Sequence, residues 1–537
     1  MSGFPPDLRA RSLEALRDAT VDVLIVGGGI NGAGIARELG LRREQAGGTM
    51  RVAVVDRSQF GSGTSGKNSQ LIHGGLRYLK YLQFSLVKES LHERAVLRRL
   101  APHMVQPLAF LMPIYSRVEK LKILMGLSMY DQLAGDQNIS KHREVSKREI
   151  ASLEPDLEQK GLAGGALFYD CRIHSARFVL ENLFEAAANG ILMANHVEAE
   201  IGERLKDGSH PVRLQDRLSG EAIHCTAKKI VDARGAWSDP PGAKPRLVRG
   251  SHLVLPRLTA EEHAIAYFEE DGRIIFFIPW GSERQFTLLG TTDIEHTEGA
   301  DHPQISAQEV QYLLNVARKL YPKAESFEPV STFSSLRPLV ASSSGSATAA
   351  SREHHIFNTP DGILRIQGGK YTTYRSMAEE ATKLLLKEIS PFLNWHSKSA
   401  QEPLGGNSEK ALARFEYDAP AMAQKYGITR VAMDQLIHDF GLATPDVLAM
   451  IPDDDFGPVT RVEYARISYA IEREMALRLH DVMFVSSYLG YERRWTEDSL
   501  QPYCYLMGSW LGWDSARQAR EIARVLRNVE LPVPAET

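Results

Sequence analysis

Residues 21–56 read VDVLIVGGGINGAGIARELGLRREQAGGTMRVAVVD, and this stretch decides the fold. Its first part, VDVLIVGG, is a run of β-branched and apolar residues that ends in glycines, which is typical of a buried strand. NGAGIARELGLRREQ predicts a helix, and RVAVVD predicts a second strand after the insert QAGGTM. A strand, a helix and a strand in this order predict one mononucleotide-binding half of a Rossmann-like α/β domain.

The predicted strand and helix are joined by the glycine motif GxGxxG, formed by Gly27, Gly29 and Gly32. The first glycine permits a tight turn, the second lets a pyrophosphate approach the backbone, and the third allows the helix to pack closely. Asp56 ends the second strand, 24 residues beyond Gly32, where a carboxylate accepts hydrogen bonds from an adenosine ribose. These residues predict a dinucleotide site but do not separate NAD from FAD. Glycines that serve only a turn are the alternative.

Two further segments favour FAD. SQFGSGTSGKNSQLIHGGLRYLKY (58–81) is rich in glycine and hydroxyl groups, whose donors can follow a diphosphate toward a flavin ring. GILRIQGGKYTTYRSMAEEA (362–381) combines a strand, a glycine pair and a helix start, which would aim N–H groups and a helix dipole at the N1/C2 carbonyl edge of a flavin. The cofactor contacts expected from these segments are Thr64, Ser65, Asn68, Ser69, Gly368, Gly369 and Thr372.

Composition narrows the class of protein. The chain has 537 residues and a net charge of −4 without a long basic tract, so a nucleic-acid partner is not expected. Cys171, Cys225 and Cys504 lie far apart and form no metal-binding pattern, which favours a reducing compartment, the cytoplasm, and no metal. The N-terminus lacks the apolar core of a secretion signal, and no long apolar run predicts a membrane-spanning helix.

The pattern of residues changes along the chain. Residues 79–135 are predicted to be helical, residues 190–300 contain short alternating strands typical of an antiparallel sheet, and the last 130 residues or so are helical. We therefore expect a body over 1–391, a linker over 392–407 and a helical domain over 408–537. The body divides into cofactor parts (about 18–80, 190–240 and 355–391) and a substrate layer (about 80–190 and 245–355).

Several strings together resemble one family. These are DVLIVGGGINGAGIARE, LIHGGLRYL, MYDQL, RGSHLVLP, IIFFIPW, LLGTTD, SLRPL and GGKYTTYR. Their order and approximate spacing over residues 18–390 resemble those of the FAD-dependent, quinone-linked glycerol-3-phosphate dehydrogenases, a family that includes an oxygen-using oxidase branch. The resemblance implies a fold of the glycine oxidase/D-amino-acid oxidase type. It also implies FAD as cofactor and oxidation of glycerol 3-phosphate to dihydroxyacetone phosphate, with a quinone as electron acceptor.

The resemblance also implies site residues. His252, in GSH at a strand start, is the candidate base or orients the alcohol by a hydrogen bond, although a lone histidine in a strand is more often structural. Gly235, in DARGAW, is expected to contact the cofactor; the family usually has a small or hydroxylic residue where Arg234 precedes it. Arginine and lysine suit a phosphate dianion and a developing alkoxide. The resemblance places Arg77, Tyr78, Arg337, Arg352 and Lys370 around the substrate.

Residues 117–134, RVEKLKILMGLSMYDQLA, raise the question of a membrane contact. The segment has a broad apolar surface and begins with Arg117, Lys120 and Lys122, as expected of a helix at anionic headgroups. A helix packed into the protein is the alternative. Because members of the family are peripheral membrane proteins, we expect the chain to lie on the inner face of the cytoplasmic membrane. The sequence leaves the oligomeric state open, and a homodimer is compatible with it.

Three rival functions stay open at this point. The first is an oxidase of the same substrate that passes electrons to oxygen. The second is a flavin dehydrogenase of a small hydroxy or amino acid, for which fewer cations would suffice. The third is a non-catalytic flavoprotein that keeps the fold without turnover. LHDVMFVSSYLG (479–490) is less basic than the corresponding family motif, so no role is transferred to the helical domain.

Overall fold

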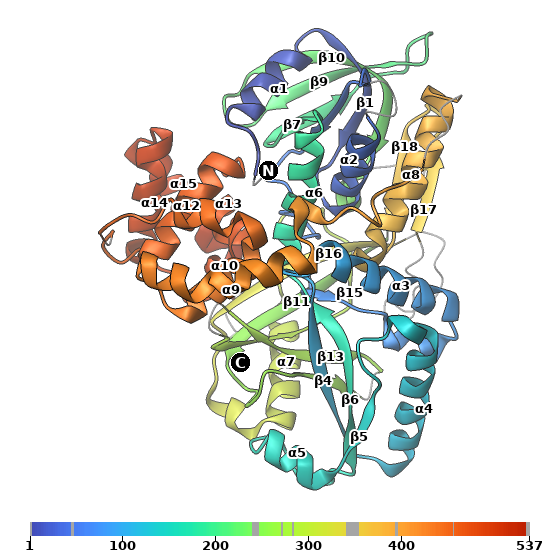
Figure 1. Cartoon of the computed structure of the whole chain (residues 1–537), viewed down its shortest axis with the longest axis vertical. Helices are drawn as coiled ribbons and strands as arrows, with labels where there is room; N and C mark the ends of the chain where they lie inside the picture. Colours follow the sequence, from blue (N-terminus) through green and yellow to red (C-terminus); the bar gives the residue numbers. More distant parts are fainter. Residues whose placement is uncertain are drawn as a thin grey trace.

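The computed structural model describes residues 3–43, 48–238, 246–269, 272–281, 284–339, 354–391, 396–454 and 456–532. Figure 1 shows one sheet with its helices in the upper half, a second sheet in the lower half, and the C-terminal helices packed beside both. The expected α/β architecture, with a Rossmann-like part, an antiparallel sheet and a helical C-terminal part, is confirmed.

The first sheet is built around β1 (Ala19–Val26), which pairs in parallel with β2 (Val52–Val55) and β10 (Ala222–Asp232). Its strand order is β17-β18-β10-β1-β2-β7. The outer strands are β7 (Leu192–Ala194), β17 (His354–Asn358) and β18 (Leu364–Gly368), and β8 (Val197–Ile201) and β9 (His210–Asp216) join through β10. Strands from three distant stretches of sequence therefore form one sheet, and the carboxyl ends of the parallel strands β1, β2, β7, β10 and β18 share one edge.

Both faces of this sheet are covered. Val23 and Ile25 belong to one apolar cluster and Leu24 and Val26 to another, as the period of two in a strand requires. The helices α2 (Ile30–Arg42), α6 (Ser175–Ala188) and α8 (Tyr374–Ile389) pack together on the first face, and α1 (Leu8–Leu16) contributes to the second. Burial on both faces explains why residues 23–26, VLIV, are continuously apolar.

The second sheet is mostly antiparallel, with the strand order β15-β11-β14-β13-β12-β4-β6-β3. Its strands are β3 (Leu71–Ile72), β4 (Gln106–Ile114), β5 (Arg143–Val145), β6 (Gly164–Arg172), β11 (Arg246–Pro256), β12 (Ala264–Phe268), β13 (Ile274–Trp280), β14 (Phe286–Gly290), β15 (Ile294–His296) and β16 (Ser331–Leu339). One face packs against α7 (Ala307–Leu320), where Leu253 and Phe277 meet Leu313. Alternate residues, such as Phe276, face the first sheet instead.

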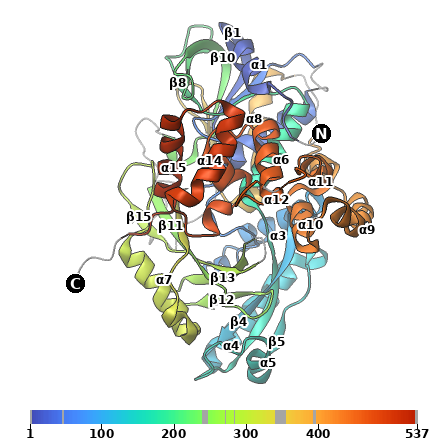
Figure 2. The same ribbon diagram turned by 90° about the vertical axis from the view of Figure 1, so that its left-hand side faces the viewer.

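The remaining helices lie beside this sheet or form the C-terminal part. Those beside the sheet are α3 (Phe84–Leu100), α4 (Arg117–Ala134) and α5 (Lys147–Leu153). The C-terminal helices are α9 (Glu409–Tyr426), α10 (Arg430–Phe440), α11 (Thr444–Leu448), α12 (Arg461–Arg473), α13 (Leu479–Asp481), α14 (Glu497–Leu511) and α15 (Ser515–Val529). Figure 2 shows α14 and α15 in front of the region where the two sheets meet. Among the described residues, no helix combines the length and hydropathy that crossing a membrane requires.

A buried ion pair joins the C-terminal helices to the body. Arg177 of α6 is fully buried and pairs with Glu474, next to α12, while its Nε donates to the Asp439 carbonyl at 2.7 Å. The guanidinium carbon also lies 4.0 Å from the ring centroid of Phe440. A single arginine of the body therefore binds groups at the ends of two C-terminal helices.

Substitution of this arginine tests how far the junction stabilises the fold. Arg177→Met should lower the free energy of unfolding by about 3–5 kcal/mol, because it leaves the buried Glu474 without its cation. Arg430→Met is the control: it breaks an exposed pair with Asp434 within α10 and should cost less than about 0.5 kcal/mol. Urea unfolding followed by circular dichroism measures both, and equal losses would contradict the importance of the buried pair.

Candidate active site

A cavity of about 1000 Å³ lies between the two sheets. Its lining begins at the carboxyl ends of β1 and β10 and continues through the loop that follows β2. It then extends to the end of β16 and to the turn after β18. The size is at the upper end of the range for small-molecule pockets, which suits a dinucleotide with a small second ligand.

The glycine motif forms one end of the cavity. Gly27 has a φ of +108°, and a Cβ atom there would lie 2.6 Å from the Ala233 carbonyl oxygen. A Cβ atom on Gly32 would lie only 1.9 Å from the Gly27 carbonyl oxygen, so the first turn of α2 packs directly on the strand end. The N-cap residue Gly29 makes no side-chain capping bond. The N–H groups at the start of α2 therefore face a region suited to an anion.

Asp56, at the end of β2, lies at the same end of the cavity. Its carboxylate accepts hydrogen bonds from the N–H of Gly28 (2.7 Å) and of Ser58 (2.8 Å). Burial raises the pKa of Asp56, while these two N–H groups oppose the rise. The neighbouring Arg57 pairs with Asp301 and does not bind Asp56, so its charge is already balanced.

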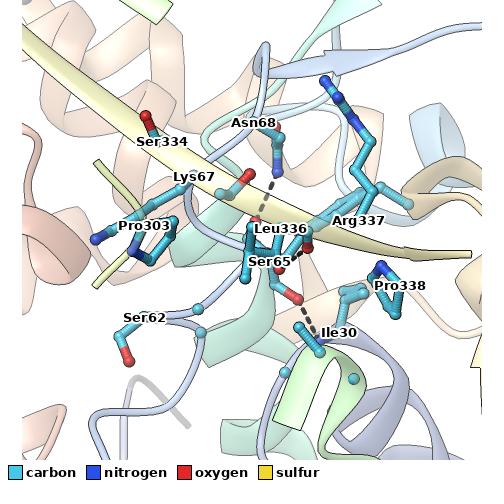
Figure 3. A pocket seen from close by; sticks show the side chains of 18 of the residues that line it. Ile30, Ser62, Ser65, Lys67, Asn68, Pro303, Ser334, Leu336, Arg337 and Pro338 are labelled. Atoms are coloured by element: carbon cyan, nitrogen blue, oxygen red, sulfur yellow. Dashed lines mark hydrogen bonds between the residues drawn. The ribbon is translucent and has the colours of Figure 1, made fainter. Parts of the chain in front are cut away.

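The loop after β2 brings its hydroxyl and amide groups to the cavity (Figure 3). Ser65 Oγ accepts from the Ile30 N–H at 2.9 Å, which ties the loop to the start of α2. Thr64 Oγ1 donates to the Leu336 carbonyl at 2.6 Å, and Asn68 donates to the Ser65 carbonyl at 2.8 Å. The loop is thus fixed to α2 and to β16.

The turn after β18 approaches from the other side. Gly368 and Gly369 have φ values of +75° and +89°, which favour glycine, and both line the cavity. Thr372 Oγ1 lies 3.3 Å from both the N atom and the carbonyl oxygen of His73. Gly235 also lines the cavity, and the described part of the chain leaves open space where its side chain would be. All the predicted cofactor residues except Gly32 thus line one cavity, and Gly32 packs against Gly27 of that lining.

The predicted substrate residues Arg77, Arg337 and Lys370 line the far end of the cavity. Asp293 pairs with Arg77 at 3.2 Å and with Arg337 at 2.7 Å, so it holds the two guanidinium groups side by side. Lys370 Nζ lies 4.0 Å from the ring centroid of Tyr78. We call Arg77, Arg337 and Lys370 the cation cluster. Arg352 lies outside the described residues.

The structure places His252 behind the cavity wall. Ser69 lines the cavity, and its Oγ lies 2.9 Å from His252 Nε2, whereas the histidine ring is 1% exposed and stacks on Phe333. Burial, aided by the positive charge of Arg337, lowers the pKa of His252 to about 3, so the ring is neutral. Nδ1 has no partner among the described residues, which favours the tautomer in which Nε2 donates to Ser69. This arrangement suits an orienting role better than a base.

His73 is a cavity residue that the sequence analysis did not single out. It lies in the loop that carries Arg77, and the next residue is held by buried groups: the Gly74 N–H donates to Tyr130 Oη at 2.8 Å and contacts Asp170 at 3.2 Å. Arg94, fully buried, pairs with Asp170 at 2.6 Å. The signal available in the sequence was the placement of His73 directly before the Gly74-Gly75 pair.

Arg234 and a set of apolar residues complete the lining. Arg234 lines the cavity, but its guanidinium binds Asp232 at 2.9 Å, so it is an internal ion-pair residue and not a free surface group. The apolar wall comes from the second sheet and consists of Phe110, Met112, Phe168, Ala266, Ile274 and Phe276. A flat aromatic ligand would find an apolar surface here and charged groups beside it.

Two family models match the chain. The one described as FAD dependent oxidoreductase matches residues 22–375, and the one described as C-terminal domain of alpha-glycerophosphate oxidase matches residues 397–518. Curated relatives include an alpha-glycerophosphate oxidase of Streptococcus pyogenes, 28% identical over 98% of both chains. They also include glycerol-3-phosphate dehydrogenase 2 of Mycobacterium bovis, 29% identical over 98% of this chain and 91% of the relative.

Solved structures agree on the fold. The glycerol-3-phosphate dehydrogenase of Bacillus halodurans complexed with FAD has a TM-score of 0.78 at 24% identity, over 98% of this chain and 99% of that chain. Glycine oxidase of Geobacillus kaustophilus has a TM-score of 0.53 at 20% identity, over 70% of this chain and 99% of that one. The expectation of a glycine oxidase type of fold for the body is therefore confirmed.

The cavity fits FAD. The start of α2, where Gly29 supplies no capping side chain, would hold the diphosphate, Asp56 the ribose, and the turn at Gly368 and Gly369 the flavin edge. A side chain at Gly29 or Gly235 would enter the cavity. The described structure leaves open space at Gly235, and a Cβ atom on Gly29 would meet only Ser65 Oγ, at 3.1 Å.

A methyl group on Gly32 should abolish this fit. Gly32→Ala should raise the dissociation constant of FAD at least about 100-fold, because the new Cβ atom must displace α2 from the Gly27 carbonyl and with it the N–H groups at the helix start. Flavin absorbance per mole of purified protein measures the loss. Gly126→Ala is the control, since the described structure leaves open space around Gly126 in α4. FAD retained by Gly32→Ala would show that the close approach is unnecessary.

Proposed function

Because the chain belongs to the family of FAD-dependent oxidoreductases, we propose that it oxidises sn-glycerol 3-phosphate to dihydroxyacetone phosphate and passes the electrons to a membrane quinone. FAD, when bound, supplies the hydride acceptor. The observation that carries the proposal is the cation cluster beside the turn at Gly368 and Gly369. Relatives named for this substrate include both an oxidase and a dehydrogenase.

The charge of the cation cluster matches a phosphate dianion. Arg77, Arg337 and Lys370 carry three positive charges, and Asp293 balances one of them. Guanidinium groups bind phosphate through paired N–H donors, and partial burial strengthens these bonds. A carboxylate substrate has a single charge and two oxygens, so it would engage fewer of these cations than a phosphate dianion does. This difference supports phosphate over the hydroxy and amino acids that were the alternative.

The same end of the cavity contains groups that can hold the alcohol and take its proton. With His252 Nε2 donating to Ser69 Oγ, the Ser69 hydroxyl hydrogen can donate to the substrate oxygen. We assign His252 to positioning Ser69 and propose His73 as the proton acceptor, because His73 lines the cavity in the same loop as Arg77. Arg337 would stabilise the negative charge that develops on the oxygen.

An exposed apolar surface near this loop supports a membrane quinone as the electron acceptor. We call Leu82, Phe84, Val118, Leu121, Met125 and Met129 the apolar surface; it spans the start of α3 and the outer face of α4. Val118, Leu121 and Met125 are 64–67% exposed, which is costly in water, and Arg117 and Lys122 lie on the same helix. This combination fits an anionic membrane surface, where a quinone is available.

Anaerobic mixing with glycerol 3-phosphate tests the function. The oxidised-flavin absorbance of the holoenzyme should disappear, and Arg337→Gln should raise the substrate concentration needed for half-reduction at least about tenfold, because it removes a charge-assisted bond to phosphate. The matched control is Arg246→Gln, a partly exposed arginine of the same sheet that pairs with Glu295, outside the cavity lining. Flavin that stays oxidised with glycerol 3-phosphate would refute the substrate.

The electron acceptor needs a separate readout in the same experiment. Reduced enzyme given a soluble ubiquinone analogue should be reoxidised with one quinol formed per substrate. Stoichiometric hydrogen peroxide in air, without quinone reduction, would instead establish an oxidase. Loss of FAD from Arg337→Gln would show that Arg337 binds the cofactor and not the substrate.

Replacing two residues of the apolar surface tests the membrane contact. Leu121→Gln with Met125→Gln should lower the binding to phosphatidylglycerol vesicles at least about tenfold, because each side chain buried in lipid contributes about 1.5–3 kcal/mol. Cosedimentation with the vesicles measures the bound fraction. Tyr417→Gln with Val431→Gln is the control, since both residues are exposed on the C-terminal helices. An equal effect of the two pairs, or no binding by the wild type, would contradict a contact through α4.

A further inference from the structure

Helix α15 contributes residues to the cofactor cavity. Arg524, Arg527 and Asn528 line it, although the matched family segments end at residue 518. Figure 2 shows α15 in front of the region between the upper sheet and the lower sheet. Neither the cofactor motif nor the cation cluster explains why a C-terminal helix presents polar residues to this cavity.

The charges on this face of α15 are only partly balanced. Glu521 lies 3.0 Å from Arg517 and 3.5 Å from Arg478, so these two arginines share its single negative charge. No described carboxylate lies within ion-pair distance of Arg524 or Arg527. Two guanidinium groups without a described carboxylate partner therefore border the cavity, and an anionic ligand would be stabilised there.

Lys67, in the cofactor loop, meets the same helix. Its Nζ donates to Asn528 Oδ1 at 2.9 Å, and Figure 3 shows its side chain pointing toward Pro303 and away from Arg337. Burial lowers the pKa of Lys67 to about 8, a shift that a nearby anion would reverse. Burial, together with the positive charges of Lys67 and Arg524, lowers the pKa of His480 to about 3. Both cations therefore lie close to the His480 ring.

These cations lie near the residues that are expected to hold the ADP half of FAD. Lys67 is two residues beyond Ser65, whose Oγ binds the first N–H of α2. On the other side, Asp481 Oδ2 lies 2.8 Å from His196 Nε2, and His196 lines the cavity near Asp56. The wall formed by the C-terminal helices thus runs from the diphosphate region to the ribose region. It is distinct from the cation cluster at the flavin end.

We propose that Lys67, Arg524 and Arg527 form a cationic clasp that binds the diphosphate of FAD from the side opposite to α2, so that the helical C-terminal domain retains the cofactor. Two guanidinium groups and an ammonium group would then complement the helix N-terminus around two phosphate charges. The proposal depends on FAD binding and is independent of the substrate and of the electron acceptor.

The test compares FAD affinity in holoenzymes that differ in two charges. Arg524→Gln with Arg527→Gln should raise the dissociation constant of FAD roughly tenfold for each arginine removed. Release of FAD on dilution, followed by flavin fluorescence, gives the constant. The matched control is Arg414→Gln with Arg520→Gln, which removes two exposed arginines of the same domain outside the cavity lining. This control should retain FAD as the wild type does.

Competition identifies the part of FAD that the clasp binds. ADP should compete with FAD for the apoprotein, and its inhibition constant should rise in the clasp variant by the same factor as the FAD constant. Riboflavin, which lacks phosphate, should compete equally well with both proteins. Lys67→Met provides a second variant in the loop, and thermal unfolding of each apoprotein confirms that the fold is intact.

Three outcomes would overturn the proposal. The first is an unchanged FAD constant in the clasp variant, and the second is an equal loss in the control. The third is a clasp variant that no longer binds inorganic phosphate but keeps the FAD affinity of the wild type. The cations would then bind a free anion and not the diphosphate of FAD. A protein that binds FAD through the clasp but is not reduced by glycerol 3-phosphate would refute the proposed substrate and leave the clasp intact.

Discussion

The rest of the structure depends on the close approach of α2 to the end of β1. A Cβ atom added to Gly32 would lie 1.9 Å from the Gly27 carbonyl oxygen, so no side chain is tolerated there. Two more glycines of α2 extend the constraint. A Cβ on Gly34 would lie 2.8 Å from the Tyr374 ring of α8, and one on Gly40 would lie 3.1 Å from Asn189, directly after α6. The glycines let three helices meet on one face of the sheet, and α8 thereby carries the turn at Gly368 and Gly369 to the cavity.

The sequence predicted best what depends on local chemistry. The turn at Gly27, the strand ending in Asp56 and the buried strands follow from residue type and period alone, and the fold class they imply is confirmed. Arg77, Arg337 and Lys370 come from a short helix, a strand and a turn that are far apart in sequence, so only the resemblance predicted their convergence. His252 shows the limit of that approach: its type suggested a base, but its burial behind Ser69 depends on the pairing of β11 with β16.

The contribution of α15 could not be predicted for a related reason. A helix with many arginines is ordinarily a solvated surface helix, and nothing local distinguishes Arg524 and Arg527 from Arg520. Only packing of the C-terminal helices against the body, through contacts such as Arg177 with Glu474, turns one side of α15 toward the cavity. The cavity therefore has cations at both ends, and two anionic ligands can occupy it without sharing a counter-charge.

The last relation joins the apolar surface to the substrate end of the cavity. The outer face of α4 exposes Leu121 and Met125, while Tyr130 on its inner face binds the Gly74 N–H at 2.8 Å, three residues before Arg77. An α-helix with its side chains is about 10–12 Å across and rises about 1.5 Å per residue, so the proposed lipid contact and the loop proposed to hold the substrate lie on opposite faces of one helix, within about three turns of each other. A dissolved acceptor such as oxygen needs no such proximity. The proposed quinone stays in the membrane and would need a short path to the flavin, and α4 connects the apolar surface to the loop at the substrate end of the cavity.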